Sequence, residues 1–320
     1  MEHQKPVLKS PLSGIRLRLA PFITNPYRFA GVSSSRGIWA GGATSSGTTG
    51  QTTMDYVEIS TLSNATDFGD LTVARLGLSS VNSDTRGVWA GGNQGSSNKN
   101  EIDYVTIATL GNATDFGDLT VGRFALKGVS SDTRGIWGGG QTGSFHDEID
   151  YITIASTGNA TDFGDLVSGG MPLGSSVNSS TRGIFAGGYL SGATNMIQYI
   201  TMASLGNSID FGDLTAGRQD FAGTFDDTRG VFMGGQNTNT IDYITMASLG
   251  NATDFGDLTI SVRYNSGVSG DGRGVSGGGN ISSSTDTMDY ITIQTTGNAT
   301  DFGDLTQARN DLSGRSDYVA

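Results

Sequence analysis

The sequence predicts an all-β fold, a six-bladed β-propeller with four-stranded blades and an extended N-terminal arm. Two periodic landmarks predict it. The segment Asp-Phe-Gly-Asp-Leu occurs six times, beginning at Asp67, Asp115, Asp162, Asp210, Asp254 and Asp301. An arginine followed by glycine keeps the same period, at Arg36, Arg86, Arg134, Arg182, Arg229 and Arg273. Such a long period indicates one small structural unit that is stacked many times.

One period contains enough strand-forming segments for a complete blade. In the copy that begins at Arg123, two apolar segments flank a Ser-Asp-Thr-Arg-Gly turn, and a polar loop follows the glycines. Ile149–Ala155 is rich in β-branched and aromatic residues and is the strongest predicted strand. A turn at Asn159 then leads to a short fourth strand. Four strands in such a period are typical of a propeller blade.

The repeats set the expected domain boundaries. We expect an arm at residues 1–26 and a propeller at 27–320, with repeats near 27–72, 73–120, 121–167, 168–215, 216–259 and 260–306, and 307–320 closing the ring. The arginine-led first strand occurs seven times, once more than the other landmarks, because copies stand at both ends, at Tyr27–Ser34 and again at Arg309–Ala320. We therefore expect the C-terminal copy to complete a blade and close the ring.

The first 26 residues differ in composition from the rest. They hold four of the five prolines, and proline is poorly tolerated inside sheets. Residues 1–30 contain five basic residues and one acidic residue, whereas the whole chain carries a net charge of −12. Apolar and basic residues alternate, as in a strand, at Ile15, Arg16, Leu17, Arg18 and Leu19. We expect these five residues to dock the arm on a partner chain.

Composition argues against several functional classes. The chain has no cysteine and two histidines, which disfavours thiolate metal sites, cysteine catalysis and histidine-based centres. The N-terminus lacks a signal-peptide core, and no apolar run is long enough to span a membrane. The acidic body would repel phosphates, so we expect neither nucleic-acid nor membrane partners.

The repeat resembles the kelch repeat. The resemblance lies in Arg123, Gly139-Gly140 and Asp150-Tyr151, and it covers about residues 27–314. The tryptophan of the kelch outer strand is absent, and Phe116 and its equivalents stand nearest to that position. The resemblance implies a propeller.

The longer cassette is similar to repeats in proteins of environmental tailed phages. It combines Thr-Arg-Gly-Val-Phe-Met-Gly-Gly, Ile-Asp-Tyr-Ile-Thr-Ile and Gly-Asn-Ala-Thr-Asp-Phe-Gly-Asp-Leu. This resemblance implies no catalytic residue.

The repeated polar residues are interpreted as structural. A catalytic site needs unlike groups in unlike roles, whereas every blade has the same arginine and aspartate. Asn-Ala-Thr matches a glycosylation sequon but recurs with the structural period, which favours a turn. Asp67 and Asp70 with Asn64 could form a shallow calcium site, although capping of turns by aspartate is the simpler interpretation.

Departures from the repeat are the better guide to a ligand. Gly170 replaces an arginine, Ser276 replaces an aromatic residue, and loops near 44–53, 95–101, 142–148 and 281–286 differ in length. Loops on a rigid scaffold often carry binding, so we expect a specific ligand to contact these loops.

These observations predict a non-enzymatic structural or binding module of a phage virion, such as a tail fibre, tail adaptor or capsid decoration. The arm would dock on other virion proteins or exchange between copies in a homo-oligomer. The alternative is an adhesive propeller that binds host-surface carbohydrate through its variable polar loops. We expect no catalytic, cofactor-binding or metal-binding residue.

Overall fold

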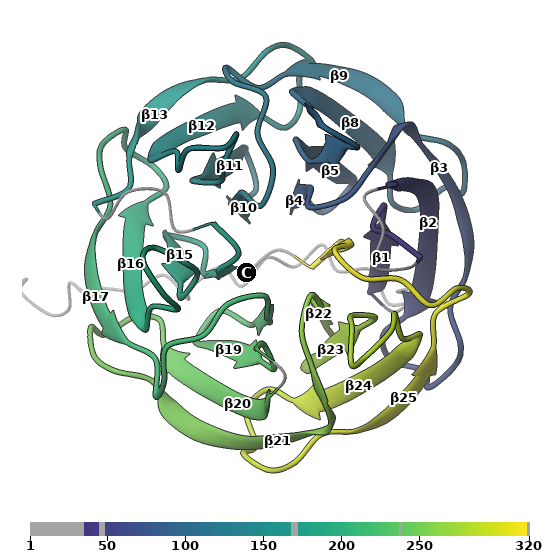
Figure 1. Ribbon diagram of the computed structural model, residues 1–320, viewed down its shortest axis with the longest axis vertical. Coiled ribbons are helices and arrows are strands. Elements are labelled where there is room, and N and C mark those ends of the chain that lie inside the picture. The colour runs from purple at the N-terminus through teal and green to yellow at the C-terminus, as the bar shows by residue number, and fades with distance from the viewer. Residues whose placement is uncertain (1–34, 45–48, 168–171, 237, 319–320) are drawn as a thin grey trace, which may run out of the picture. The chain divides into compact units, whose positions relative to one another are not determined.

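Six four-stranded antiparallel sheets surround a central axis (Figure 1). The computed structural model describes residues 35–44, 49–167, 172–236 and 238–318. The chain divides into two units, residues 1–33 and 34–320, and the described residues belong to the second. The predicted six-bladed, all-β propeller is therefore confirmed. The predicted arm, its docking residues Ile15–Leu19 and the expected strand at 27–34 lie outside the described residues.

Each blade runs from an inner strand at the axis to an outer strand at the rim. The inner strands are β26 (Ser313–Ser316), β4 (Ser79–Asn82), β10 (Lys127–Ser130), β14 (Ser175–Asn178), β18 (Ala222–Phe225) and β22 (Ser266–Gly270). The second strands are β1 (Arg36–Ala40), β5 (Arg86–Ala90), β11 (Arg134–Gly138), β15 (Arg182–Ala186), β19 (Arg229–Met233) and β23 (Arg273–Gly277).

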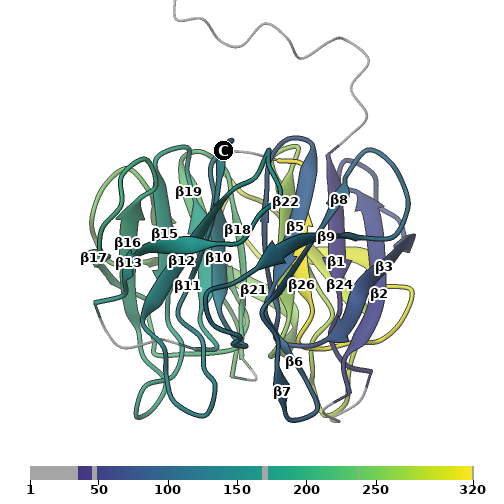
Figure 2. The same cartoon turned by 90° about the horizontal axis from the view of Figure 1, so that it is seen from above.

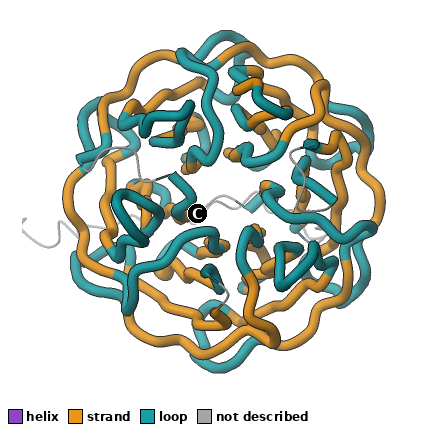
Figure 3. The backbone as a smooth tube through the Cα atoms, in the orientation of Figure 1, coloured by secondary structure: helices purple, strands orange, loops and turns teal. Residues whose placement is uncertain are grey.

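The third strands carry the Asp-Tyr or Gln-Tyr pair: β2 (Gln51–Glu58), β8 (Glu101–Thr106), β12 (Glu148–Thr153), β16 (Met196–Thr201), β20 (Thr238–Thr245) and β24 (Thr287–Thr292). The outer strands carry Asp-Phe-Gly-Asp: β3 (Thr66–Arg75), β9 (Thr114–Asp118), β13 (Thr161–Asp165), β17 (Ile209–Asp213), β21 (Thr253–Val262) and β25 (Thr300–Asp304). A two-residue hairpin, β6 (Asn93–Gln94) and β7 (Ser97–Asn98), extends from the second blade. The described residues form strands and loops, and none of them builds a helix long and apolar enough to cross a membrane (Figure 3).

The two ends of the propeller meet in the first blade. β26 pairs with β1, so Ile38 lies opposite Arg315, and the C-terminal strand takes the innermost position (Figures 1 and 2). Through this pairing the C-terminal strand and the first strand of the described region share one sheet.

The apolar core lies between the blades. Six clusters of buried side chains each join two neighbouring sheets, one cluster for each gap. The aromatic residue of the second strand reaches across the gap, because Trp39 Nε1 donates to the Ser266 carbonyl and Trp137 Nε1 to that of Ser79. Apolar and polar residues do not alternate strictly along the strands, because neighbouring blades cover both faces of each sheet.

A buried arginine–aspartate pair anchors four of the inner strands. The pairs are Arg309–Asp55, Arg75–Asp103, Arg123–Asp150 and Arg218–Asp242, with nitrogen–oxygen distances of 2.6–3.0 Å. Each arginine stands four positions before the start of an inner strand, with Arg75 as the last residue of β3, and each aspartate lies on a third strand. A threonine on the linker, such as Thr120, donates to the same carboxylate. Removing one partner of such a pair costs about 3–5 kcal/mol, because the other charge stays buried.

The fourth blade replaces this whole set. Gly170 stands at the arginine position, Gln198 at the aspartate and Val167 at the threonine. Ser208 replaces an alanine and donates to Gln198 Oε1 at 2.5 Å, and the Val167 backbone N–H donates to the same oxygen at 3.0 Å. Gln198 is neutral, so it needs no arginine from the linker as a counter-charge.

The sixth blade departs differently. Val262 stands where the other linkers carry arginine, and Arg263 follows it. Asp289 then accepts hydrogen bonds from Thr259 alone among the described residues. Burial raises the pKa of Asp289.

We expect deletion of residues 309–320 to lower the unfolding midpoint by more than about 10 °C, at about 2–4 °C per kcal/mol. The deletion removes β26 and leaves Asp55 buried without Arg309. Thermal unfolding followed by circular dichroism measures it. An unchanged midpoint would contradict the role of β26 in closure.

We expect Gln198→Asp to destabilise the protein by about 3–5 kcal/mol, because it buries a carboxylate beside a linker without arginine. Denaturant titration at pH 7 measures the loss. The reciprocal variant Asp103→Asn, which leaves Arg75 unpaired, should lose a similar amount. If Gln198→Asp is as stable as the wild type, the substitutions of the fourth blade do not compensate one another.

Candidate functional site

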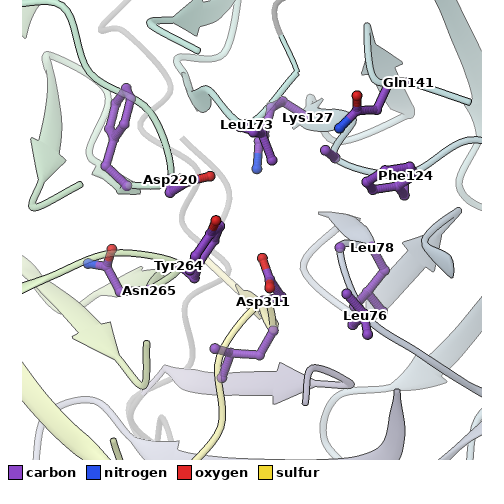
Figure 4. Close-up of a pocket in the computed structure, with 14 residues that line it drawn as sticks. Leu76, Leu78, Phe124, Lys127, Gln141, Leu173, Asp220, Tyr264, Asn265 and Asp311 are labelled. Atoms are coloured by element: carbon purple, nitrogen blue, oxygen red, sulfur yellow. The ribbon is translucent and has the colours of Figure 1, made fainter. Parts of the chain in front are cut away.

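A cavity opens at one end of the central axis. The loops between second and third strands lie at this end, which we call the loop face, and β6 and β7 mark it in Figure 2. The cavity, here called the axial mouth, has a volume of about 250 Å³. Its lining includes Leu76, Phe124, Lys127, Asp220, Tyr264 and Asp311 (Figure 4).

A closed ring of backbone hydrogen bonds surrounds the axial mouth. One residue from each blade takes part: Gly77, Ala125, Leu173, Asp220, Tyr264 and Asp311. Each N–H donates to the carbonyl of the equivalent residue in the preceding blade, with N···O distances of 2.5–3.4 Å. All six blades are therefore joined around the mouth.

All six residues of this ring have a left-handed backbone, with φ between 52° and 66°. Only Gly77 is a glycine. A left-handed conformation costs about 1–2 kcal/mol for an ordinary residue, and leucine and tyrosine adopt it rarely. Such strain often marks functional positions. The side chains at this ring are consequently held in fixed directions at the mouth.

The side chains of the ring break the repeat symmetry. Gly77, Ala125 and Leu173 on consecutive blades are apolar, whereas Asp220, Tyr264 and Asp311 on the next three are ionisable. The three ionisable side chains point toward one opening, together with Lys127 (Figure 4). The mouth thus combines an apolar half with a polar half, which a repeated structural position does not require.

Two buried acceptors at the mouth have no donor among the described residues. Asp220 is 5% exposed; its Oδ2 accepts from Gln219 Nε2 at 3.0 Å, but its Oδ1 is unpartnered. Asn265 is 6% exposed, and its Oδ1 is also unpartnered. Burying an unsatisfied acceptor costs about 1–3 kcal/mol. A ligand that brings donors would remove this penalty.

The departure at Ser276 belongs to this site. Asn265 Nδ2 donates to Ser276 Oγ at 2.7 Å and to the Met233 carbonyl at 3.1 Å. Both bonds hold the amide, so its oxygen keeps a fixed position at the mouth. The aromatic residue that other blades carry at the Ser276 position offers no hydroxyl for this bond.

The charges at the mouth affect one another without forming ion pairs. Burial raises the pKa of Asp311 to about 7, and the negative charge of Asp220 adds to the rise. Burial also raises the pKa of Asp220 to about 6, while Gln219, Lys127, Arg263 and the nearby Tyr264 hydroxyl oppose the rise. Burial lowers the pKa of Lys127 and raises that of Tyr264 to about 12. Near neutral pH the mouth therefore carries acids that are easily protonated.

The six predicted arginines lie at the rim of the opposite end of the ring. Each Nη1 donates to a carbonyl of the next blade at 2.8–3.2 Å, as Arg86 does to Ile154. Each guanidinium also lies 4.5–5.2 Å from a tyrosine ring centre of its own blade. The six join neighbouring blades and lie away from the mouth.

The six predicted aspartates have exposed side chains. Asp67, Asp115, Asp162, Asp210, Asp254 and Asp301 accept no hydrogen bond among the described residues. The structure does not bring them together with the arginines. The motif serves the blade contact through its backbone instead.

Asn-Ala-Thr and Asp-Phe-Gly-Asp of neighbouring blades contact each other at the outer strands. Each asparagine Oδ1 accepts from the backbone N–H of the second aspartate of the preceding blade at 3.0–3.1 Å, as Asn112 does from Asp70. A Cβ on Gly69 would lie 2.5 Å from the Gly111 carbonyl oxygen. The glycine permits this close approach.

The variable loops lie on the same face as the mouth. Residues 45–48 are outside the described part, and the predicted loop 44–53 includes the start of β2. Gln141, which precedes the loop at 142–148, lines the mouth. The exposed rings of Phe145, in the loop at 142–148, and Tyr189, between β15 and β16, form an edge-to-face pair at 6.3 Å.

Sequence reasoning missed Lys127, Asp220, Tyr264, Asn265 and Asp311. A signal for three of them was present, because the ring position carries a different residue in each repeat except for the two aspartates. Among the described residues, no group of three or more histidine, cysteine, aspartate or glutamate side chains could hold a metal ion. No family model matches the chain, and a search of the curated proteins finds no match.

Proposed function

We propose that this protein is a non-enzymatic binding module whose axial mouth recognises a polyhydroxylated ligand, such as one sugar residue of a surface glycan. The unpartnered acceptors Asp220 Oδ1 and Asn265 Oδ1, buried beside a cavity of about 250 Å³, carry the proposal. The sequence led us to expect ligand contacts in the variable loops. In this proposal the ligand lies in the mouth, and the loops surround it.

Hydroxyl groups suit this lining better than a charged group does. A hydroxyl donates one hydrogen bond and accepts others, so one diol can donate to Asp220 and accept from Lys127. The carboxylates of Asp220 and Asp311 face the cations of Lys127 and Arg263. Because two negative charges face two positive ones, a neutral ligand is favoured over an ammonium ion.

The other half of the mouth supports the same ligand class. Leu76, Phe124 and Leu173 line it with apolar surface, which can cover the C–H face of a sugar ring. Pockets for drug-sized ligands hold about 300–1,000 Å³, so this smaller cavity accommodates one ring. Glycoside hydrolysis requires two carboxyl groups that flank a bond between two rings. A mouth of this size favours binding over hydrolysis.

We also propose that the module is part of a phage virion, with kelch-like blades and a basic arm that docks on other virion proteins. The support is the resemblance of the repeat cassette and the contrast between the basic first 30 residues and the acidic body. Opposite charges favour association between the arm and an acidic neighbour.

We expect at least one neutral sugar from a panel of glucose, galactose, mannose and N-acetylglucosamine to bind with a Kd of about 1 mM, at about 0.3 kcal/mol per non-hydrogen atom. Isothermal titration calorimetry at pH 8 measures this. Asp220→Asn should weaken binding at least about tenfold, since a charge-assisted hydrogen bond contributes about 1.5–3 kcal/mol. Affinity should fall from pH 8 to pH 5 as Asp311 and Asp220 become protonated.

Asp67→Asn is the matched control, because it removes the same charge from an exposed side chain. It should bind as the wild type does.

A raised folded-state pKa favours the protonated native state, so Asp220 and Asp311 lower stability as pH rises through about 6 to 7. Asp311→Asn should therefore raise the unfolding midpoint at pH 8. Binding of choline without any sugar, or release of reducing sugar from oligosaccharides, would overturn the proposal.

For the virion role, we expect peptides of this chain in density-purified particles at a constant ratio to the major capsid protein. Quantitative mass spectrometry measures the ratio. A chain without residues 1–26 should bind sugar normally and be missing from particles. Recovery of the protein only in the soluble lysate would contradict the virion role and leave the sugar proposal standing.

A further inference from the structure

Arg315 occupies a position that is apolar or uncharged in the other blades. The third residue of the inner strand is Val81, Val129, Val177, Thr224 or Val268 in the others. Those side chains lie between blades, where Val81, for example, packs against Gly135. The Trp89 ring packs over Gly87 in the gap next to Arg315. Arg315 therefore turns away from the gap and into the axial channel.

The guanidinium of Arg315 contacts four other blades. Nε donates to Asn82 Oδ1 at 2.6 Å, and Nη2 donates to Ser130 Oγ at 2.5 Å and to Asn178 Oδ1 at 3.1 Å. The ring centre of Phe225 lies 5.5 Å from the guanidinium carbon. All three acceptors are uncharged, and Nη1 has no hydrogen-bond partner among the described residues.

This cation has no counter-ion among the described residues. Arg315 is 8% exposed and forms no ion pair, whereas Arg75, Arg123, Arg218 and Arg309 each pair with an aspartate. Burial alone accounts for the lowering of its pKa to about 9. A buried charge without a partner is strongly unfavourable, so the position calls for an anion.

A small polar cavity adjoins the guanidinium. This axial neck has a volume of about 60 Å³, and its lining includes Arg315, Lys127, Ser80, Ser176, Ser266 and Ser313. It also shares Lys127 and Asn265 with the axial mouth. A cavity needs about 10–15 Å³ to admit one water molecule, so the neck has room for a small ion.

Lys127 and the guanidinium lie at different levels of the axis. Lys127 begins β10, and Ser130, which binds Arg315, ends it. Three residues of strand span about 10 Å, which places the neck between two cations. Hydroxyl and backbone groups line the walls between them. No acidic side chain is among the residues that line the neck.

We propose that the axial neck binds a small inorganic anion of chloride size, held by Arg315 at one end and drawn by Lys127 at the other. The anion supplies the missing counter-charge and joins the C-terminal strand to the opposite blades. The neck shares Lys127 and Asn265 with the mouth, but anion binding by Arg315 does not require a sugar to be bound.

Crystals grown without halide and soaked in bromide test the site. Anomalous scattering should show one bromide in the neck within contact of Arg315. In solution, the unfolding midpoint should be about 2–5 °C higher in sodium chloride than in sodium gluconate at equal ionic strength, because gluconate is too large for the neck.

Arg315→Met should remove both the bromide peak and the chloride dependence. Arg86→Met is the matched control, since it removes an arginine from the rim and should keep both signals. If Arg315→Met fails to fold, Lys127→Met should fold and reduce the chloride shift at least twofold.

Water or a carboxylate of the chain beside Arg315 would overturn the proposal, as would equal midpoints in chloride and gluconate. Bromide that appears only at molar concentration would mean an adventitious ion only. Sugar titrations in both salts separate the two sites: equal affinities with a chloride-dependent midpoint support the neck and leave the mouth unchanged.

Discussion

Closure of the ring is the constraint on which the rest of the structure depends. Every blade must meet two neighbours at the axis, and six backbone hydrogen bonds make this contact through left-handed residues. Rim arginines and outer-strand asparagines repeat the same contacts at larger radius. Because all three layers join neighbouring blades, each blade is stable only as part of the complete ring.

A symmetric scaffold of this kind leaves a few positions free to vary. The backbone bonds at the mouth do not depend on side-chain identity, so glycine, leucine and tyrosine occupy equivalent positions. Unlike side chains therefore collect at the axis without disturbing the contacts between blades. The buried carboxylate of Asp220 lowers stability at neutral pH, a cost of the kind that proteins often carry at functional positions.

The period of the repeat was sufficient to predict the propeller, the four strands and the closing strand. Periodic glycines, aromatic residues and turns carry that information locally, and they agree with one another in every repeat. Of the site, the sequence indicated only the departure at Ser276, because the other departures that stand out are in loop length and not at the ring positions. Asp220 and Tyr264 stand at equivalent positions of the repeat and differ only in side chain. The side chains of Lys127 and Arg315 extend toward the axis, and the sequence does not reveal this orientation. Gln198 was missed for a related reason: the substitution that accompanies it, Gly170 in place of arginine, lies 28 positions earlier in the sequence.

The substitutions of the fourth blade bear on how such a chain can evolve. Val167 and Gly170 precede the inner strand β14, whereas Gln198 and Ser208 follow it. All four changes therefore lie between two successive Asp-Phe-Gly-Asp motifs, which begin at positions 162 and 210. A genetic exchange that cut at the start of β14 would separate a linker without arginine from its glutamine and leave a buried aspartate alone. An exchange that cut within the outer strands would keep the set together. Unequal crossing-over in this gene would therefore yield folded products only when the exchanged unit begins and ends in the outer strand, out of phase with the blade.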